Sequence, residues 1–181
     1  MTLKYSLNEN DYLQSQLFIA SKTERIKNQR TRSWILISLG FFSLSYLFSQ
    51  TDKDFLVYYF IGLGILSIFL YPIYQKSYYR KHYQKYIADT LKNRFGELST
   101  ITFTDTNIEC FDKTGNGKIN LTEIEEIFEI MEYFFLRMKS GVSLIIPKSK
   151  IENTDNLRTE LKTLADKLKV NYTSELNWKW K

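Results

Sequence analysis

The longest hydrophobic stretches of this chain lie close together in its first half. Two uncharged apolar segments, 33–51 and 55–75, follow each other with only residues 52–54 between them. At ~1.5 Å per residue, each segment is long enough to cross the ~30 Å hydrocarbon layer of a bilayer as a helix. The pattern therefore predicts two transmembrane helices joined by an extracytoplasmic turn at 52–54. A buried helical hairpin in a soluble protein is the alternative that shares this pattern.

The segment before the first span, 1–32, reads as a strand followed by a helix. Leu3, Tyr5 and Leu7 alternate with polar residues, which is typical of a strand with one buried face. Asn8 is placed to cap the helix that follows, and no glycine or proline precedes Gly40 in the middle of the first span. We therefore expect one continuous helix from this cytoplasmic segment into the membrane.

The second span is expected to continue as a basic juxtamembrane helix over 76–95, which Gly96 ends. The segment 96–181 then shows short runs of β-branched and aromatic residues separated by turns, including a hairpin turn at 139–141. Leucines at helical spacing follow, with Thr154 or Asp155 as the cap. The expected fold class is α+β: a transmembrane helical hairpin plus a small antiparallel-sheet domain closed by a C-terminal helix.

Charge refines this picture, because the net charge of +5 comes from the flanks of the two spans. Lysine and arginine resist translocation, so both termini are expected in the cytoplasm and the turn outside, in a multi-pass protein of the inner membrane. The cations then face anionic lipid headgroups rather than a nucleic acid. The side chains expected at the membrane interface are basic or aromatic: Arg30, Arg32, Trp34, Tyr74, Tyr78, Arg80 and Lys81.

One motif resembles a calcium-binding loop. Residues 112–123 match the twelve-residue EF-hand pattern, in which the oxygen ligands would be Asp112, Thr114, Asn116, Asn120 and Glu123. An EF-hand also needs an entering helix, whereas 101–111 is rich in strand-forming residues. A glycine hairpin between two strands requires the same residue types. We therefore expect no metal or cofactor, and a membrane-anchored calcium-binding protein remains the alternative.

Catalysis finds little support in the residues. The one histidine, His82, lies among basic residues that are expected near headgroups, and the glutamates of 123–132 are typical of a solvated face. The one cysteine, Cys110, can form no internal disulfide, and we expect it to be a small buried or half-buried side chain. The chain is therefore expected not to be an enzyme.

Several segments also occur together in a known family. They are Tyr-Ser-Leu-Asn-Glu-Asn-Asp-Tyr-Leu at 5–13, Ile-Thr-Phe-Thr at 101–104, Asn-Ile at 107–108, Ile-Glu-Glu-Ile-Phe at 124–128, Tyr-Phe-Phe-Leu at 133–136 and Leu-Ile-Ile-Pro-Lys at 144–148. With the two close-set spans, the chain resembles the YcxB-like family of small bacterial membrane proteins over nearly its whole length. This resemblance implies a pleckstrin-homology-like cytoplasmic domain over 96–181 and carries over no catalytic residues.

The expected function is that of a non-enzymatic integral membrane protein whose cytoplasmic domain binds a protein or lipid partner, in regulation, as a scaffold or in immunity to a toxin. A lipid would use Lys148, Lys150 and the juxtamembrane cations. A peptide would add a strand at the sheet edge near 133–138. A homodimer is left open, and a transporter subunit is disfavoured because the spans contain no ionisable residue.

Overall fold

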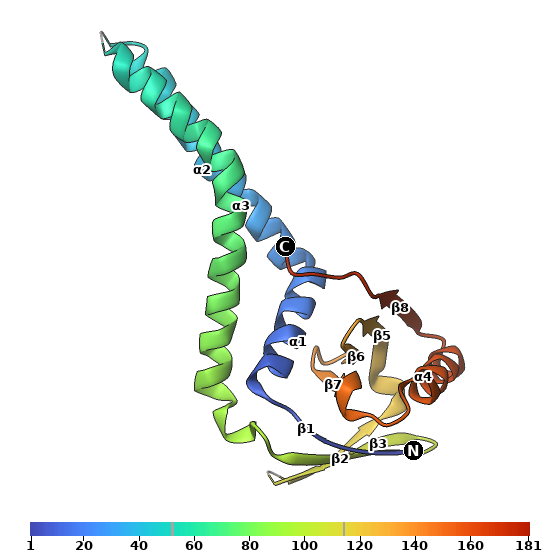
Figure 1. Cartoon of the computed structure of the whole chain (residues 1–181). Helices are drawn as coiled ribbons and strands as arrows, with labels where there is room; N and C mark the ends of the chain where they lie inside the picture. Colours follow the sequence, from blue (N-terminus) through green and yellow to red (C-terminus); the bar gives the residue numbers. More distant parts are fainter. Residues whose placement is uncertain (52, 114) are drawn as a thin grey trace. The chain divides into compact units, whose positions relative to one another are not determined.

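The chain folds into two units of different composition, and Figure 1 shows them in a computed structural model that describes residues 1–51, 53–113 and 115–181. The sheet unit consists of Met1–Ser15 and Tyr86–Lys179, and the helical unit of Gln16–Lys85 and Trp180–Lys181. Asp52 of the expected turn and Thr114 of the alternative calcium loop lie outside the described residues.

The elements follow in this order: β1 (Thr2–Ser6), α1 (Glu9–Lys22), α2 (Glu24–Phe48), α3 (Asp54–Thr90), β2 (Leu98–Phe103), β3 (Asn107–Asp112), β4 (Gly115–Asn120), β5 (Ile124–Ile130), β6 (Tyr133–Met138), β7 (Ser143–Pro147), α4 (Thr154–Leu168) and β8 (Asn171–Glu175). Short 3₁₀ turns cover Lys92–Arg94, Leu121–Glu123 and Lys148–Lys150. Helices and antiparallel strands occur together, so the fold class is α+β, as the sequence predicts.

The sheet unit contains two four-stranded sheets, with strand orders β1-β2-β3-β4 and β7-β6-β5-β8. The first sheet is antiparallel throughout, and it begins with the N-terminal strand: Thr2 pairs with Thr102, 100 positions further along the chain. In the second sheet β8 runs parallel to β5, while the other pairs are antiparallel. The N-terminal strand is therefore part of this unit, whereas the sequence analysis placed it in a separate segment, 1–32.

Side chains from both sheets and from α4 share one core. Alternation along β1 buries Leu3 and Tyr5, and both belong to one hydrophobic cluster that also contains Ile108 of β3, Phe134 of β6 and Leu161 of α4. Tyr5 also donates a hydrogen bond from its hydroxyl to the main-chain oxygen of Ile145 in β7, at 2.6 Å. The expected strand at 3–7 is confirmed, and its buried face joins the two sheets.

The cap of α1 is also as the sequence predicts. The side chain of Asn8 accepts a hydrogen bond from the main-chain nitrogen of Asp11 at 2.9 Å, and the carboxylate of Asp11 accepts one from Asn8 N at 2.8 Å. This reciprocal pair satisfies two main-chain donors at the start of the helix.

Two expectations about helices are wrong. The helix does not run without a break into the first span: Thr23 is extended, with φ −79° and ψ 113°, and α2 begins at the next residue. The hydroxyl of Thr23 bonds back to Ile19 O at 2.9 Å, a local bond by which threonine competes with helical geometry. The cap of α4 is Asn153, whose side chain accepts from Asn156 N, and not Thr154 or Asp155.

The helix expected over 76–95 ends earlier than predicted. The helical run of α3 stops at Thr90, a 3₁₀ turn covers Lys92–Arg94, and Gly96 has a φ of +75°, a left-handed value that favours glycine. The hairpin at 139–141 is confirmed, with β6 and β7 on its two sides. Two strands were not predicted in full: β5 (Ile124–Ile130), and β8, which follows the helix that was expected to close the domain.

Replacing Tyr5 with phenylalanine tests the bond between the sheets. Tyr5→Phe leaves the buried oxygen of Ile145 without its donor, so we expect the free energy of unfolding to fall by about 1–3 kcal/mol. Urea unfolding of the detergent-solubilised chain measures the change. Tyr86→Phe is the control, because Tyr86 is 50% exposed. Equal stability of the two variants would contradict a structural role for the Tyr5 hydroxyl.

Candidate functional site

Two helices, α2 and α3, are long and apolar enough to cross a membrane. In the most apolar window of each, only 11% and 6% of the residues are buried. Large apolar side chains are exposed along both, for example Leu36 at 61%, Tyr46 at 68% and Phe69 at 69%. A core helix of a soluble protein would be mostly buried, so the alternative of a buried soluble hairpin does not fit the described residues.

Polar side chains of the two helices are turned inward. The hydroxyls of Ser38 and Ser67 lie 3.0 Å apart, and Ser45 donates to the main-chain oxygen of Val57 at 3.1 Å. Gln75 donates from its amide nitrogen to Ser33 Oγ at 2.8 Å. Ser38, Ser45 and Gln75 are only 8%, 5% and 6% exposed. Burial of polar groups and exposure of apolar ones is the reverse of the arrangement in a soluble protein. In a hydrocarbon medium, polar groups must likewise find their hydrogen bonds within the protein.

The two helices approach closely at one glycine. A Cβ atom placed on Gly64 would lie 2.9 Å from Cε1 and Cζ of Phe42, whereas one on Gly62 would meet nothing within 4 Å. Further along the pair, the rings of Phe48 and Phe60 stack with their centroids 5.4 Å apart. Gly64 therefore leaves room for the Phe42 ring, and Gly62 and Gly40 make no such contact.

A cation–aromatic cluster joins the ends of the two spans that the sequence predicts to be cytoplasmic. The guanidinium of Arg30 lies 4.7 Å from the ring centroid of Trp180 and 5.6 Å from that of Tyr79. Trp180 is 8% exposed and donates from Nε1 to the main-chain oxygen of Lys76 at 3.0 Å. Sequence reasoning predicted Arg30 at the interface and missed Trp180, because no local pattern connects a tryptophan near position 180 with a helix near position 30.

The other expected interface residues fall into three groups. Trp34 is bonded within the hairpin, since its Nε1 donates to Ile68 O at 3.2 Å. Tyr74 and Tyr78 stack on each other with centroids 5.9 Å apart and remain 59% and 52% exposed. The three remaining basic residues are exposed: Arg32, Arg80 and Lys81.

Within the sheet unit, Glu129 lies at the centre of a buried polar cluster. Its Oε1 accepts from Lys148 Nζ at 2.6 Å and from Arg158 Nε at 2.8 Å, and its Oε2 accepts from the hydroxyl of Tyr172 at 2.7 Å. Burial alone would raise the pKa of Glu129, but the bonds from Lys148, Tyr172 and Arg158 outweigh it and lower the pKa to about 2. Glu129 is 2% exposed, so it does not belong to the solvated face expected for the glutamates of 123–132.

A second buried carboxylate, that of Asp11, connects α1 with the second sheet. Asp11 accepts from the hydroxyl of Tyr133 at 2.8 Å and from Lys150 Nζ at 3.0 Å, and it is 4% exposed. Lys148 and Lys150 were expected to contact lipid headgroups. In the structure they form ion pairs with Glu129 and Asp11 instead, and these pairs lie inside the sheet unit.

The segment 112–123, which matches the calcium-loop pattern, covers the last residue of β3, strand β4 and the 3₁₀ turn that follows. In the pairing of β3 with β4, Asp112 faces Gly115 and Asn107 faces Asn120. Asp112 and Asn120 are therefore at opposite ends of the hairpin, about 17 Å apart at ~3.3 Å per residue. Thr114 lies outside the described residues, Asn116 is in β4, and Glu123 belongs to the following 3₁₀ turn. This register does not bring the proposed ligands together around one ion.

Cys110 and His82 lie in separate places, Cys110 in β3 and His82 in α3. Cys110 is half-buried in β3, where burial and then the nearby Asp112 raise the pKa of its thiol. His82 is exposed on α3 and stacks on Tyr78, with ring centroids 6.4 Å apart.

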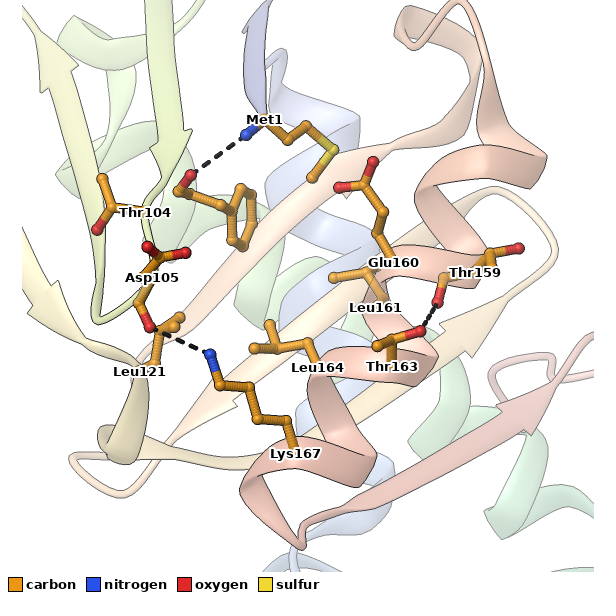
Figure 2. A pocket seen from close by; sticks show the side chains of 11 residues that line it. Met1, Thr104, Asp105, Leu121, Thr159, Glu160, Leu161, Thr163, Leu164 and Lys167 are labelled. Atoms are coloured by element: carbon orange, nitrogen blue, oxygen red, sulfur yellow. Dashed lines mark hydrogen bonds between the residues drawn. The ribbon is translucent and has the colours of Figure 1, made fainter.

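Figure 2 shows a pocket of about 320 Å³ between the turn after β2 and helix α4. Leu121, Leu161 and Leu164 contribute its apolar lining. At its rim, Lys167 Nζ lies 3.5 Å from the main-chain oxygen of Asp105. The hydroxyl of Thr163 is bonded within the helix, to Thr159 O at 3.0 Å. The polar ends of Thr163 and Lys167 thus bond within the protein.

Glycine substitutions test the packing of the helix pair. Gly64→Val forces the Phe42 ring to move, so we expect a loss of about 1–3 kcal/mol in stability and a lower unfolding temperature in detergent. Gly62→Val carries the same change of residue in the same helix without the clash and serves as the control. A larger loss for the Gly62 variant would contradict the packing described here.

The Glu129 cluster predicts a dependence of stability on pH. The folded-state pKa of about 2 lies below the ordinary value of 4.5, so the ionised carboxylate stabilises the fold above that ordinary pKa. This contribution, about 3 kcal/mol, is lost as the pH falls through the folded-state value. We expect Glu129→Gln to remove it, which lowers the free energy of unfolding at neutral pH and flattens its fall between about pH 5 and about pH 2.

Urea unfolding at several pH values measures this effect. Glu125→Gln is the matched control, because Glu125 forms a surface pair with Arg137 at 3.2 Å and its side chain is 48% exposed. An exposed pair contributes at most about 1 kcal/mol. Identical pH profiles for the two variants would show that Glu129 is not held as described.

Comparison with known proteins identifies no relative: no family model, no curated protein and no solved structure matches the chain. The resemblance to the YcxB-like family therefore stays a prediction from the residues quoted above, as does a pleckstrin-homology-like fold for the sheet unit. The α+β class and the two apolar helices rest on the structure itself.

Proposed function

We propose that this chain is an integral protein of the bacterial inner membrane that crosses the bilayer with α2 and α3 and carries a partner-binding domain on the cytoplasmic side. The observation that supports it most is the inside-out packing of the helix pair, with Ser38, Ser45 and Gln75 buried and the large apolar side chains exposed. A bilayer would cover that apolar surface, which water would not.

The topology has a second line of support in the sheet unit. The chain leaves this unit after Ser15 and returns to it at Tyr86, and β1 on one side pairs with β2 on the other. Two strands that share hydrogen bonds must lie in one compartment, so the two ends of the hairpin are on the same side of the membrane. The basic residues that flank the spans make that side the cytoplasm.

A binding role is proposed in preference to catalysis because of how the buried charges are used. The carboxylates of Glu129 and Asp11 are each held by a lysine and a tyrosine hydroxyl of the same unit. Groups that are locked in this way stabilise a fold and are poorly placed to exchange protons with a substrate. The sheet unit is thus proposed to bind a protein or lipid partner as a regulator, scaffold or immunity protein.

Cysteine labelling tests the topology. In a Cys110→Ala background, Lys53→Cys places one thiol in the turn between the spans, and Lys113→Cys places one on an exposed lysine of the sheet unit. In intact cells, a membrane-impermeant maleimide is expected to label the first variant and not the second. After permeabilisation both should react. Labelling of the Lys113→Cys variant in intact cells, or recovery of the chain in the soluble fraction, would overturn the proposal.

A further inference from the structure

The outer edge of β1 lies along a groove of the sheet unit. Among residues 1–51, 53–113 and 115–181, β1 is the terminal strand of its sheet and pairs with β2 alone. A groove of about 580 Å³ is lined on one side by the first residues of the chain, Met1 to Lys4, and on the other by the segment that leads into α4, including Lys150, Ile151, Asn153 and Leu157. Both Leu3, which points into the core, and its neighbours Thr2 and Lys4 line it, so the groove follows the strand edge rather than one face.

Hydrogen bonding to β2 shows which main-chain groups face this groove. Met1 and Phe103 exchange two main-chain bonds, of 2.8 and 3.2 Å, so they form a hydrogen-bonded pair. In an antiparallel pair such residues alternate with residues whose N–H and C=O point away from the partner strand. Thr2, Lys4 and Ser6 are therefore the residues of β1 whose main-chain groups point outward.

A lysine at one end of the groove supports this assignment. Lys150 Nζ donates to the main-chain oxygen of Ser6 and, at 3.0 Å, to the carboxylate of Asp11. Lys150 thus occupies the outward main-chain oxygen of Ser6. Within the described part of the chain, no hydrogen bond satisfies the outward N–H and C=O groups of Thr2 and Lys4.

The groove wall combines apolar and polar groups. Leu3 and Leu157 belong to the core, and Ile151 packs against it, which gives the groove an apolar lining. The polar side chains at the start of α4 bond among themselves: Asn153 caps the helix at Asn156 N, and Asn156 donates to Glu160 at 3.0 Å. The outward main-chain donors and acceptors of β1 at Thr2 and Lys4 therefore face the groove without a partner among the described residues, and the exposed side chain of Glu152 adds one negative charge to its wall.

We propose that this groove binds an extended segment of a partner polypeptide, which adds a strand to the sheet at β1. The segment would exchange hydrogen bonds with Thr2 and Lys4 and place an apolar side chain against Leu3, Ile151 and Leu157. A volume of about 580 Å³ is in the range of ligand sites. Strand addition of this kind draws affinity from main-chain bonds and specificity from alternate side chains.

This inference rests on the proposed function, and it names the class of partner. It also relocates the peptide edge that the sequence predicted: β6 (133–138) is bonded to β5 on one side and to β7 on the other, so it has no free edge. β1 has one.

The test uses a phage-displayed library of random heptapeptides, selected on the full chain in lipid nanodiscs. Binding of a selected peptide is measured by calorimetry against the unmodified chain, Lys4→Ala and Lys4→Pro. Proline removes the outward N–H donor and is tolerated on a strand edge, where that donor bonds to no neighbouring strand. We expect Lys4→Pro to weaken binding at least about tenfold, while Lys4→Ala, which keeps the donor, binds within about threefold of the unmodified chain.

Two further readouts do not depend on the folding of the proline variant. N-methylation of the peptide is expected to weaken binding at every second position, as strand pairing requires. Amide exchange at Lys4 in the unmodified chain is expected to be fast without peptide and slowed with it. Selection of no binder, or binding that is insensitive to both the proline and the N-methyl groups, would overturn the inference.

The outcomes separate this inference from the proposed function. Self-association in nanodiscs that Lys4→Pro abolishes would assign the groove to a second copy of the chain and overturn the peptide. Cysteine labelling at positions 53 and 113 reports on topology alone, so a failed peptide test with correct labelling would leave the membrane proposal intact. Incorrect labelling with a bound peptide would reject the proposed function and retain the groove.

Discussion

The pairing of β1 with β2 is the constraint on which the rest of the structure depends. It closes a sheet between residues 100 positions apart, with both long apolar helices in the intervening sequence. Because loop-closure entropy grows only slowly with loop length, so long an insertion costs little more than a short one. Burial of Leu3 and Tyr5 in the common core, and the bond from Tyr5 to Ile145, offset that cost. Because the chain leaves the sheet unit after Ser15 and returns to it at Tyr86, the insertion must bring its two ends back together.

The two units use opposite solutions for polar groups. In the sheet unit, Glu129 and Asp11 are buried with cations and tyrosine hydroxyls around them, which a buried charge requires in any medium. In the described part of the helical unit the buried polar residues are Ser38, Ser45 and Gln75, which are uncharged, and each finds a partner in the facing helix. The second arrangement suits a medium that offers no hydrogen bonds. This contrast supports the proposal that the bilayer covers the helix pair alone.

Several predictions from the sequence failed where two distant segments meet. The sequence predicts Glu129 to be one of several surface glutamates. In the structure it accepts hydrogen bonds from Lys148, Arg158 and Tyr172, which belong to three other segments. Lys148 and Lys150 were predicted to be available to lipid because their carboxylate partners, Glu129 and Asp11, are distant in sequence. The calcium motif at 112–123, which the sequence analysis kept only as an alternative, matches by residue type, and the strand register of β3 and β4 separates its ends. Trp180 had no neighbour in sequence that would indicate its contact with Arg30.

The sequence by itself determined the features that depend on local pattern. The two apolar spans, the strand at Leu3 and Tyr5, the Asn8 cap, the 139–141 hairpin and the helix near the C-terminus all follow from periodicity and from the conformational preferences of single residues. Only the tertiary structure decided that β1 belongs with strands beyond the spans, that β6 is central and that β1 has an open edge. Strand order is set by long-range hydrogen bonds and shared burial, and the alternation of residues within one strand does not specify which strand lies beside it.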